Sequence, residues 1–258
     1  MSAVGALLRE LFFAPFREML HGLDAVLRHG LRSLLLVAAG LVVGWWVYVP
    51  LHELLHAFGC LAAGGEVSRL EIAPVYGGGW LSKLFPFVVP GGPYAGRLSG
   101  FDSHGSDWIY LATDLAPFAL ALFPGFWWLR RAAFAGRPVA FGAALPAAFA
   151  PLLSLSGDAY EIGSLATVHL PVWSGHRQLV GDDLGIKLAE IAGLADAHLL
   201  AGVGVAASLG LLWALTWMLL ARRLASRLGA PAPAERTAAR PVSNRAGGQA
   251  RDQAPGSG

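Results

Sequence analysis

The sequence predicts an all-α membrane protein with about four transmembrane helices, an N-terminal interfacial amphipathic helix and a small β-like loop after the first span. Three observations support this. The 258 residues are 55% hydrophobic and only 14% charged, whereas a soluble domain carries about 25% charged residues. The uncharged residues gather in four stretches, each long enough to cross a bilayer, which takes roughly 20 apolar residues. Basic residues collect beside these stretches. A soluble domain of ordinary size is therefore excluded, and the lipid bilayer is the first predicted partner.

The first segment, residues 1–30, is predicted to form an amphipathic helix. Apolar residues recur at helical spacing over residues 4–29, against a face of alternating acidic and basic residues. Such a helix lies in the membrane interface rather than across it. Packing of this helix against the cytoplasmic side of the protein is the alternative. The apolar residues that define the face are Val4, Leu7, Leu8, Leu11, Phe12, Phe16, Leu20, Leu23 and Leu27.

The second segment, residues 31–228, holds the four predicted spans. They cover about residues 33–63, 108–128, 138–155 and 199–221. The first is longer than the hydrocarbon layer is thick, so it must tilt or emerge from the bilayer. Pro50 removes one helical hydrogen bond and predicts a kink just before His52.

Basic residues predict the orientation of the spans. Arginines precede the first span, fill the short loop between the second and third, and follow the fourth, whereas the other two loops hold fewer. The positive-inside rule then places both termini in the cytoplasm. An integral protein of a bacterial cytoplasmic membrane is expected, the bacterial origin resting on the many Arg and Ala residues. The tail 229–258 has no apolar period and is predicted to be disordered.

Two further observations exclude other classes of protein. The net charge is only +2, and the basic residues form no groove, so no nucleic-acid partner is expected. The single cysteine, Cys60, excludes an internal disulfide framework. Between the first two spans, the Gly- and Pro-rich loop 64–106 contains short β-like runs at Glu66–Ile72 and Leu84–Val89.

The sequence His52-Glu53-Leu54-Leu55-His56 at the end of the first span predicts a metal site. Histidines four residues apart on a helix point the same way and can bind one ion. Glu53 is then placed to take a proton from a water molecule at the metal, as in zinc hydrolases. Ionisable groups in an apolar helix are costly unless they have partners, and a metal ion supplies one.

A catalytic zinc needs a third protein ligand. Asp158 is the first candidate, because the predicted topology brings it to the same membrane side as His52 and His56; capping of a helix that begins near Ala159 is its alternative role. Asp114, inside the second span, is the second candidate and could instead orient a histidine ligand. Glu161 is the third. Cys60 lies about 12 Å along the helix from His52, too far for a shared ion.

These residues resemble the site-2-protease family of intramembrane zinc metalloproteases. The resemblance rests on His52-Glu53-Leu54-Leu55-His56, the small residues that follow, and the short run Glu66–Ile72, similar to a strand these proteases place after their motif helix. The family's third ligand is an Asp in a Leu-Asp-Gly motif; here Asp158 follows Gly157. The resemblance implies that His52, His56 and Asp158 bind Zn²⁺, and that Glu53 is the catalytic base in cleaving a membrane-protein or peptide substrate.

Several alternatives stay open. In familiar family members the site opens toward the cytoplasm, whereas the basic residues here place it outside. A substrate strand is expected to add to Glu66–Ile72. A metal transporter is the second functional class, although transporters need a relay of ligands across the bilayer. A non-catalytic metal-binding relative is the third. Nothing in the sequence predicts the substrate, the regulation or the oligomeric state.

Overall fold

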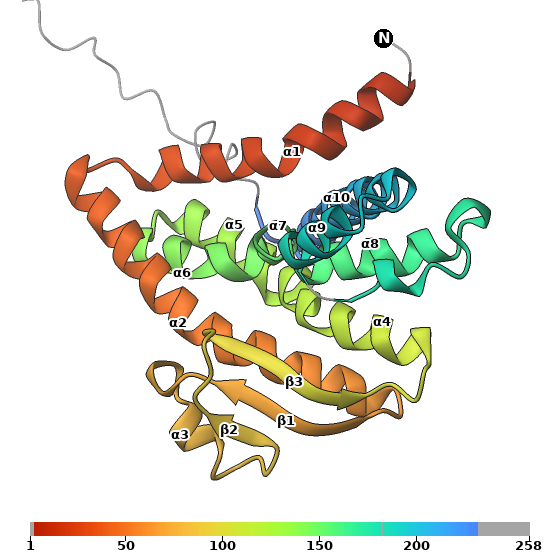
Figure 1. Cartoon of the computed structure of the whole chain (residues 1–258). Coiled ribbons are helices and arrows are strands. Elements are labelled where there is room, and N and C mark those ends of the chain that lie inside the picture. The colour runs from red at the N-terminus through yellow and green to blue at the C-terminus, as the bar shows by residue number, and fades with distance from the viewer. Residues whose placement is uncertain (1–2, 182, 232–258) are drawn as a thin grey trace, which may run out of the picture.

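The computed structural model describes residues 3–181 and 183–231, which are mostly helical with one small sheet (Figure 1). The predicted disordered tail lies outside the described residues from residue 232 onward. The helices of eight or more residues are α1 (Ala3–Val26), α2 (Leu31–Ala62), α4 (Asp107–Leu115), α5 (Phe126–Ala135), α6 (Pro138–Ala148), α8 (Asp158–Val168), α9 (Leu184–Gly193) and α10 (Ala197–Arg227).

Short helical turns connect these helices. They are η1 (Pro74–Tyr76), α3 (Gly78–Leu81), η2 (Ala116–Phe118), η3 (Ala121–Gly125), α7 (Ala150–Leu153), η4 (Pro171–Trp173) and η5 (Arg177–Leu179).

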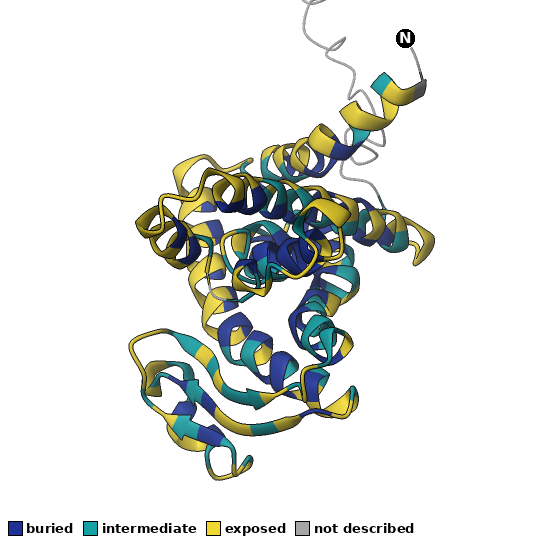
Figure 2. Cartoon of the chain, turned by 45° about the vertical axis from the view of Figure 1, so that its right-hand side comes forward, coloured by how far each residue is buried: buried dark blue, intermediate teal, exposed yellow. Residues whose placement is uncertain are grey.

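Three helices in the described part of the chain are long and apolar enough to cross a membrane: α2, the run Asp107–Ala135 from α4 to α5, and α10. They coincide with the first, second and fourth predicted spans. Large apolar side chains stay exposed along them, such as Val42 at 69% and Val43 at 57% on α2. Figure 2 shows such exposed residues (yellow) alongside buried ones (dark blue) on the same helices. Apolar side chains that face outward on a long helix are typical of a membrane protein.

The predicted third span, residues 138–155, is broken. Its only helix of ten or more residues is α6, with 11 residues, or about 16 Å of helix, which is half the thickness of the hydrocarbon layer. The backbone leaves helical geometry at Phe149, Ser154 and Gly157. The chain resumes in α8, which begins at Asp158. The count of four spans therefore stays a prediction.

Glycines let the two halves of this broken segment pack closely on long helices. A Cβ atom on Gly44 of α2 would lie 2.4 Å from the Ala143 carbonyl oxygen of α6, and one on Gly163 of α8 would lie 2.1 Å from the Ala206 oxygen of α10. Backbones that approach this closely exclude any side chain, as at small-residue contacts between membrane helices. Helix α6 thus lies along α2, and α8 lies along α10.

Helix α1 lies across one end of the helical bundle (Figure 1). Its buried Glu18 forms ion pairs with Arg130 of α5 and Arg222 of α10. On its outer side, large apolar residues such as Leu7 and Phe13 are more than half exposed. The amphipathic helix is therefore confirmed as a helix, and an exposed apolar side is what an interfacial position requires.

The loop between the first two long helices contains a three-stranded sheet in the order β2-β1-β3. Strand β1 (Glu66–Ile72) pairs in parallel with β2 (Val88–Pro90) and antiparallel with β3 (Gly96–Asp102). The first predicted run matches β1, only the end of the second forms β2, and β3 was not predicted. The description "all-α" is corrected to a mostly helical fold with a small sheet, whose buried residues pack on α2 around Leu54 and Ala57.

Candidate metal centre

The end of α2 positions both histidines of the predicted motif. His52 and His56 are each only 7% exposed. His56 Nδ1 lies 2.9 Å from the backbone carbonyl oxygen of Thr113. Because a carbonyl oxygen only accepts hydrogen bonds, Nδ1 of His56 carries the proton, and Nε2 of the neutral ring carries the lone pair. His52 Nδ1 lies 2.8 Å from the Tyr48 hydroxyl, which can accept in the same way.

The Nε2 atoms of His52 and His56 lie close to each other and to the Asp158 carboxylate. They lie 3.2 Å from each other, His52 Nε2 lies 3.1 Å from Asp158 Oδ2, and His56 Nε2 lies 3.4 Å from Asp158 Oδ1. Within the described chain, these three residues form the only group of three or more potential metal ligands. The structure therefore brings together His52, His56 and Asp158, as the sequence predicted.

The geometry of this group fits a zinc ion. Ligand atoms about 2.0–2.1 Å from a tetrahedral zinc lie about 3.3 Å from one another. The two imidazole nitrogens are separated by about this distance, and each has one of the two Asp158 oxygens at about this distance. With one ligand atom taken from each residue, the three atoms lie within 4.8 Å of one another. Asp158 Oδ2 is buried and accepts no hydrogen bond from any described residue. Lone pairs that converge without a shared proton repel one another, and a divalent cation relieves that repulsion. The donor set, two imidazoles and a carboxylate, is one that catalytic zinc sites use.

Glu53 directly follows His52 on α2 and lines the same cavity as the two histidines. Its side chain packs against Gly96, the first residue of β3, where a Cβ atom would lie 2.3 Å from Glu53 Cγ and 2.7 Å from Cδ. Gly96 is therefore the residue that leaves room for the Glu53 carboxylate. Glu53 is not one of the three grouped ligands, so its carboxylate is available for another role.

A cavity of about 370 Å³ contains these groups. Helices α2, α4 and α8 contribute its two imidazoles and four of its carboxyl groups, Asp183 before α9 contributes a fifth, and β3 contributes one wall. Since β1 is the central strand of the sheet, β3 is an edge strand, and residues along it line the cavity. Strand β1 pairs with β3 from Glu66 to Ile72, but with β2 only from Leu70 to Ile72. The expected addition of a substrate strand to Glu66–Ile72 therefore stays a prediction, and the paired end Leu70–Ile72 leaves no free edge for it.

The other candidate ligands take different positions. Asp114 and Glu161 line the cavity but lie outside the group of three ligands. Cys60 is fully buried and donates a hydrogen bond to the Glu66 carbonyl oxygen at 3.6 Å. It also lies outside the ligand group, as expected.

Sequence reasoning missed three parts of this site. Tyr48 precedes His52 by one helical turn, so the helical spacing that groups the histidines could have found it. The Thr113 carbonyl belongs to the backbone and leaves no signal in the residue type. Gly96 contributes space because it has no side chain, and this role is visible only from its contact with Glu53 in the structure.

An ion pair ties the loop after α8 to the start of α4. Arg177, in the loop after α8, donates two hydrogen bonds to Asp107 at the start of α4, at 2.8 and 2.6 Å. These hydrogen bonds raise the pKa of the Arg177 guanidinium above its ordinary value. Nearby, Leu184 N donates to the Ser156 carbonyl oxygen at 2.7 Å. The loops around Asp158 are thus tied to both α4 and α9.

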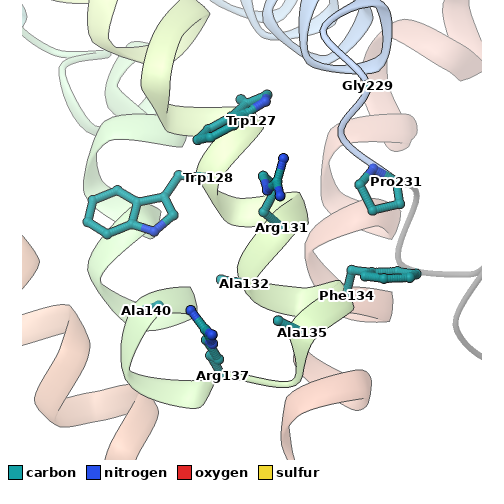
Figure 3. A pocket seen from close by; sticks show the side chains of 10 residues that line it. All are labelled: Trp127, Trp128, Arg131, Ala132, Phe134, Ala135, Arg137, Ala140, Gly229 and Pro231. Carbon is teal, nitrogen blue, oxygen red and sulfur yellow. The ribbon is translucent and has the colours of Figure 1, made fainter.

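A second cavity, of about 390 Å³, lies at the turn between α5 and α6. Figure 3 shows Trp127, Trp128 and Arg131 on α5, with Arg137 where the chain turns toward α6. The described lining of this cavity contains no His, Cys, Asp or Glu. It therefore offers no metal ligands or general base, and the candidate site is the first cavity.

The described chain combines three helices long and apolar enough to span a membrane with a His₂Asp cluster that could hold a metal ion. No protein-family model, curated protein or solved structure matches the chain.

Proposed function

We propose that the protein is a membrane-embedded zinc peptidase similar to the site-2-protease family, which cleaves peptide bonds of membrane-associated substrates. The observation that carries this proposal is the arrangement of His52, His56 and Asp158, whose ligand atoms, one from each residue, lie within 4.8 Å of one another in the cavity that also contains Glu53. Zinc there would polarise the peptide carbonyl and make a water molecule more acidic.

Each residue of the site then has a role. His52, His56 and Asp158 hold the ion. The Glu53 carboxylate accepts a proton from the attacking water and delivers it to the leaving amine nitrogen, as a general base and then a general acid. Tyr48 and the Thr113 carbonyl fix the orientation of the two imidazoles.

The edge of β3 is the proposed docking position for the substrate backbone. A helical substrate hides its carbonyl groups in hydrogen bonds, so it must unwind before cleavage. An unwound segment can satisfy its backbone groups by pairing with an exposed strand edge. Gly96, Arg97 and Leu98 of β3 line the cavity, so a strand added there would lie beside the cluster.

Two alternatives receive less support. A metal transporter needs a relay of ligands, and the described residues contain a single group of three ligands. A non-catalytic metal-binding relative has no need of a carboxylate beside the cluster, yet Glu53 occupies that position in the cavity.

Replacing Glu53 tests the proposal. Purified protein in detergent micelles, loaded with zinc, is expected to cleave membrane-associated peptides, and chelation is expected to stop cleavage. Glu53→Gln should retain zinc, measured by elemental analysis, while losing at least about a hundredfold in kcat, since it removes the proton acceptor. Glu190→Gln, at a half-exposed side chain paired with Lys187, is the matched control. Full activity in Glu53→Gln would end the proposal.

A further inference from the structure

Asp114 is a buried acid that the proposed reaction does not use. It is 5% exposed and lines the cavity of the metal cluster. Its Oδ2 atom is buried and has no hydrogen-bond partner among the described residues. A buried carboxyl group without a partner is costly, so an unpaired one indicates a missing hydrogen-bond donor or cation.

Glu161 is a second acid, from α8, that lines the same cavity as Asp114. It follows Asp158 by three residues on α8, so both acids lie on one face of that helix, and both line the cavity. The Tyr110 hydroxyl of α4 donates a hydrogen bond to Glu161. Tyr110 precedes Asp114 by four residues and shares its helix face. The Tyr110–Glu161 bond therefore brings the two carboxylates near each other, and their charges repel.

The charges around the cavity are unbalanced. Among the described lining residues, five carboxylates face one guanidinium, that of Arg97. A divalent ion at the cluster would still leave negative charge in excess. Asp114 and Glu161 belong to no group of three ligands in the described chain, so their geometry does not favour a second metal ion. An ammonium or guanidinium group brings its own hydrogen-bond donors and fits two acceptors of this kind.

We propose that Asp114 and Glu161 form a subsite that binds the basic side chain of a Lys or Arg residue of the substrate, next to the bond that is cleaved. This inference rests on the proposed peptidase function and names its substrate class. The substrate is the source of the cation because the subsite, the metal cluster and β3 share one cavity. Peptides with a basic residue at one position near the cleaved bond are therefore preferred substrates.

A binding experiment tests the subsite without requiring cleavage. The zinc-loaded Glu53→Gln protein in detergent micelles is titrated with fluorescent peptides of Ala, Leu and Val that carry one Lys, moved through successive positions. Matched peptides carry norleucine, which has nearly the shape of Lys without its charge. At one position the Lys peptide is expected to bind roughly tenfold or more tightly, since a paired buried charge is worth at least that much.

Variants then assign this preference to the two acids. Asp114→Asn in the same background should remove the preference for Lys while leaving the norleucine peptide's affinity unchanged. Glu161→Gln keeps an acceptor for the Tyr110 hydroxyl and should weaken the preference for Lys. It tests the subsite independently if Asp114→Asn fails to fold. Asp24→Asn, an exposed residue of α1, makes the same charge change away from the cavity and should leave the preference intact.

Two results would overturn the inference. One is equal binding of Lys and norleucine peptides at every position. The other is a Lys preference that survives both Asp114→Asn and Glu161→Gln, with zinc content and thermal unfolding unchanged. Cleavage by the unmodified protein is measured separately. A clear Lys preference without any cleavage would refute the peptidase proposal alone, and cleavage without a preference would refute the subsite alone.

Discussion

At the scale of single residues, the candidate centre depends on groups that orient the imidazoles. The Thr113 carbonyl fixes the proton of His56 on Nδ1, and the Tyr48 hydroxyl bonds to His52 Nδ1. Partners of this kind hold the ring plane and keep Nε2 free to bind a metal ion. Only the Tyr48 contact can be removed by a side-chain substitution.

Tyr48→Phe is expected to weaken zinc binding by roughly tenfold to a hundredfold, because His52 loses the group that orients it. Competition with a fluorescent zinc chelator measures the affinity. Tyr76→Phe removes a hydroxyl away from the cluster and is the control. Equal affinity in Tyr48→Phe and the unmodified protein would show that the hydroxyl does not position His52.

Gly96→Ala is expected to displace the Glu53 carboxylate, because the added methyl group would lie 2.3 Å from Glu53 Cγ. Misplacing a reacting group by about 1 Å can cost a hundredfold in rate, so kcat should fall by about that factor while zinc content stays constant. Gly79→Ala, where an added Cβ atom meets nothing within 4 Å, should leave kcat unchanged. A variant of Gly96 with normal kcat would contradict the assigned contact.

The sequence predicted part of this centre for a physical reason. Helical spacing is local, so His52, Glu53 and His56 could be grouped from five consecutive residues of the chain. Asp158 was found through topology and resemblance, while Asp114 and Glu161 stayed open, because the distances between helices depend on packing that a single sequence does not reveal. Gly96 contributes space rather than a functional group and has no signature of its own.

At the scale of elements, α2 and α6 pack through glycines. Gly40 and Gly44 lie one turn apart on α2, and a Cβ atom on either would come within 2.4 Å of a carbonyl oxygen of α6. Because α2 also carries the histidines, this contact fixes the motif helix against the broken segment that leads to Asp158.

Gly44→Ala is therefore expected to destabilise the protein by about 1–3 kcal/mol, the usual cost of adding a methyl group to a tightly packed contact. Thermal unfolding in detergent, followed by circular dichroism, measures the change. Val43→Ala is the control at the neighbouring position, whose side chain is 57% exposed. Equal melting temperatures for Gly44→Ala and the unmodified protein would contradict close packing of the two backbones.

The elements also show where sequence patterns are informative. Long apolar runs predicted α2, the run Asp107–Ala135 and α10, because burial in lipid requires an apolar surface over the whole length. The break after α6 was missed, since the residues there are as apolar as those of an intact helix. Strand β3 has three polar or charged residues and two glycines, so no alternating pattern marks it.

At the scale of the whole molecule, contacts of α1 indicate the topology. Glu18 forms ion pairs with Arg130 in the middle of α5 and with Arg222 near the end of α10, so these parts of both helices lie on the face that α1 covers. The chain that follows α5 must therefore cross the bundle to the opposite face before α10 crosses back. The segment α6–α7–α8 is the only described part of the chain available for the outward crossing.

Cysteine labelling with a membrane-impermeant maleimide tests this topology. Arg28→Cys and Arg137→Cys are expected to react from one side of sealed vesicles, and Lys83→Cys and Ser174→Cys from the other. The native Cys60 is 0% exposed and serves as the unreactive background. Labelling of Arg137→Cys and Lys83→Cys from the same side would exclude an outward crossing through α6–α8.

The break before α8 has a consequence for biogenesis. Synthesis proceeds from the N-terminus, so the two histidines enter the bilayer on α2 well before the ribosome has made Asp158. Until the broken segment inserts, the nascent chain has two ligands and lacks the acid that completes the cluster. Under the proposed peptidase function, the unfinished protein would be latent, and hydrolytic competence would arrive only with the later half of the chain.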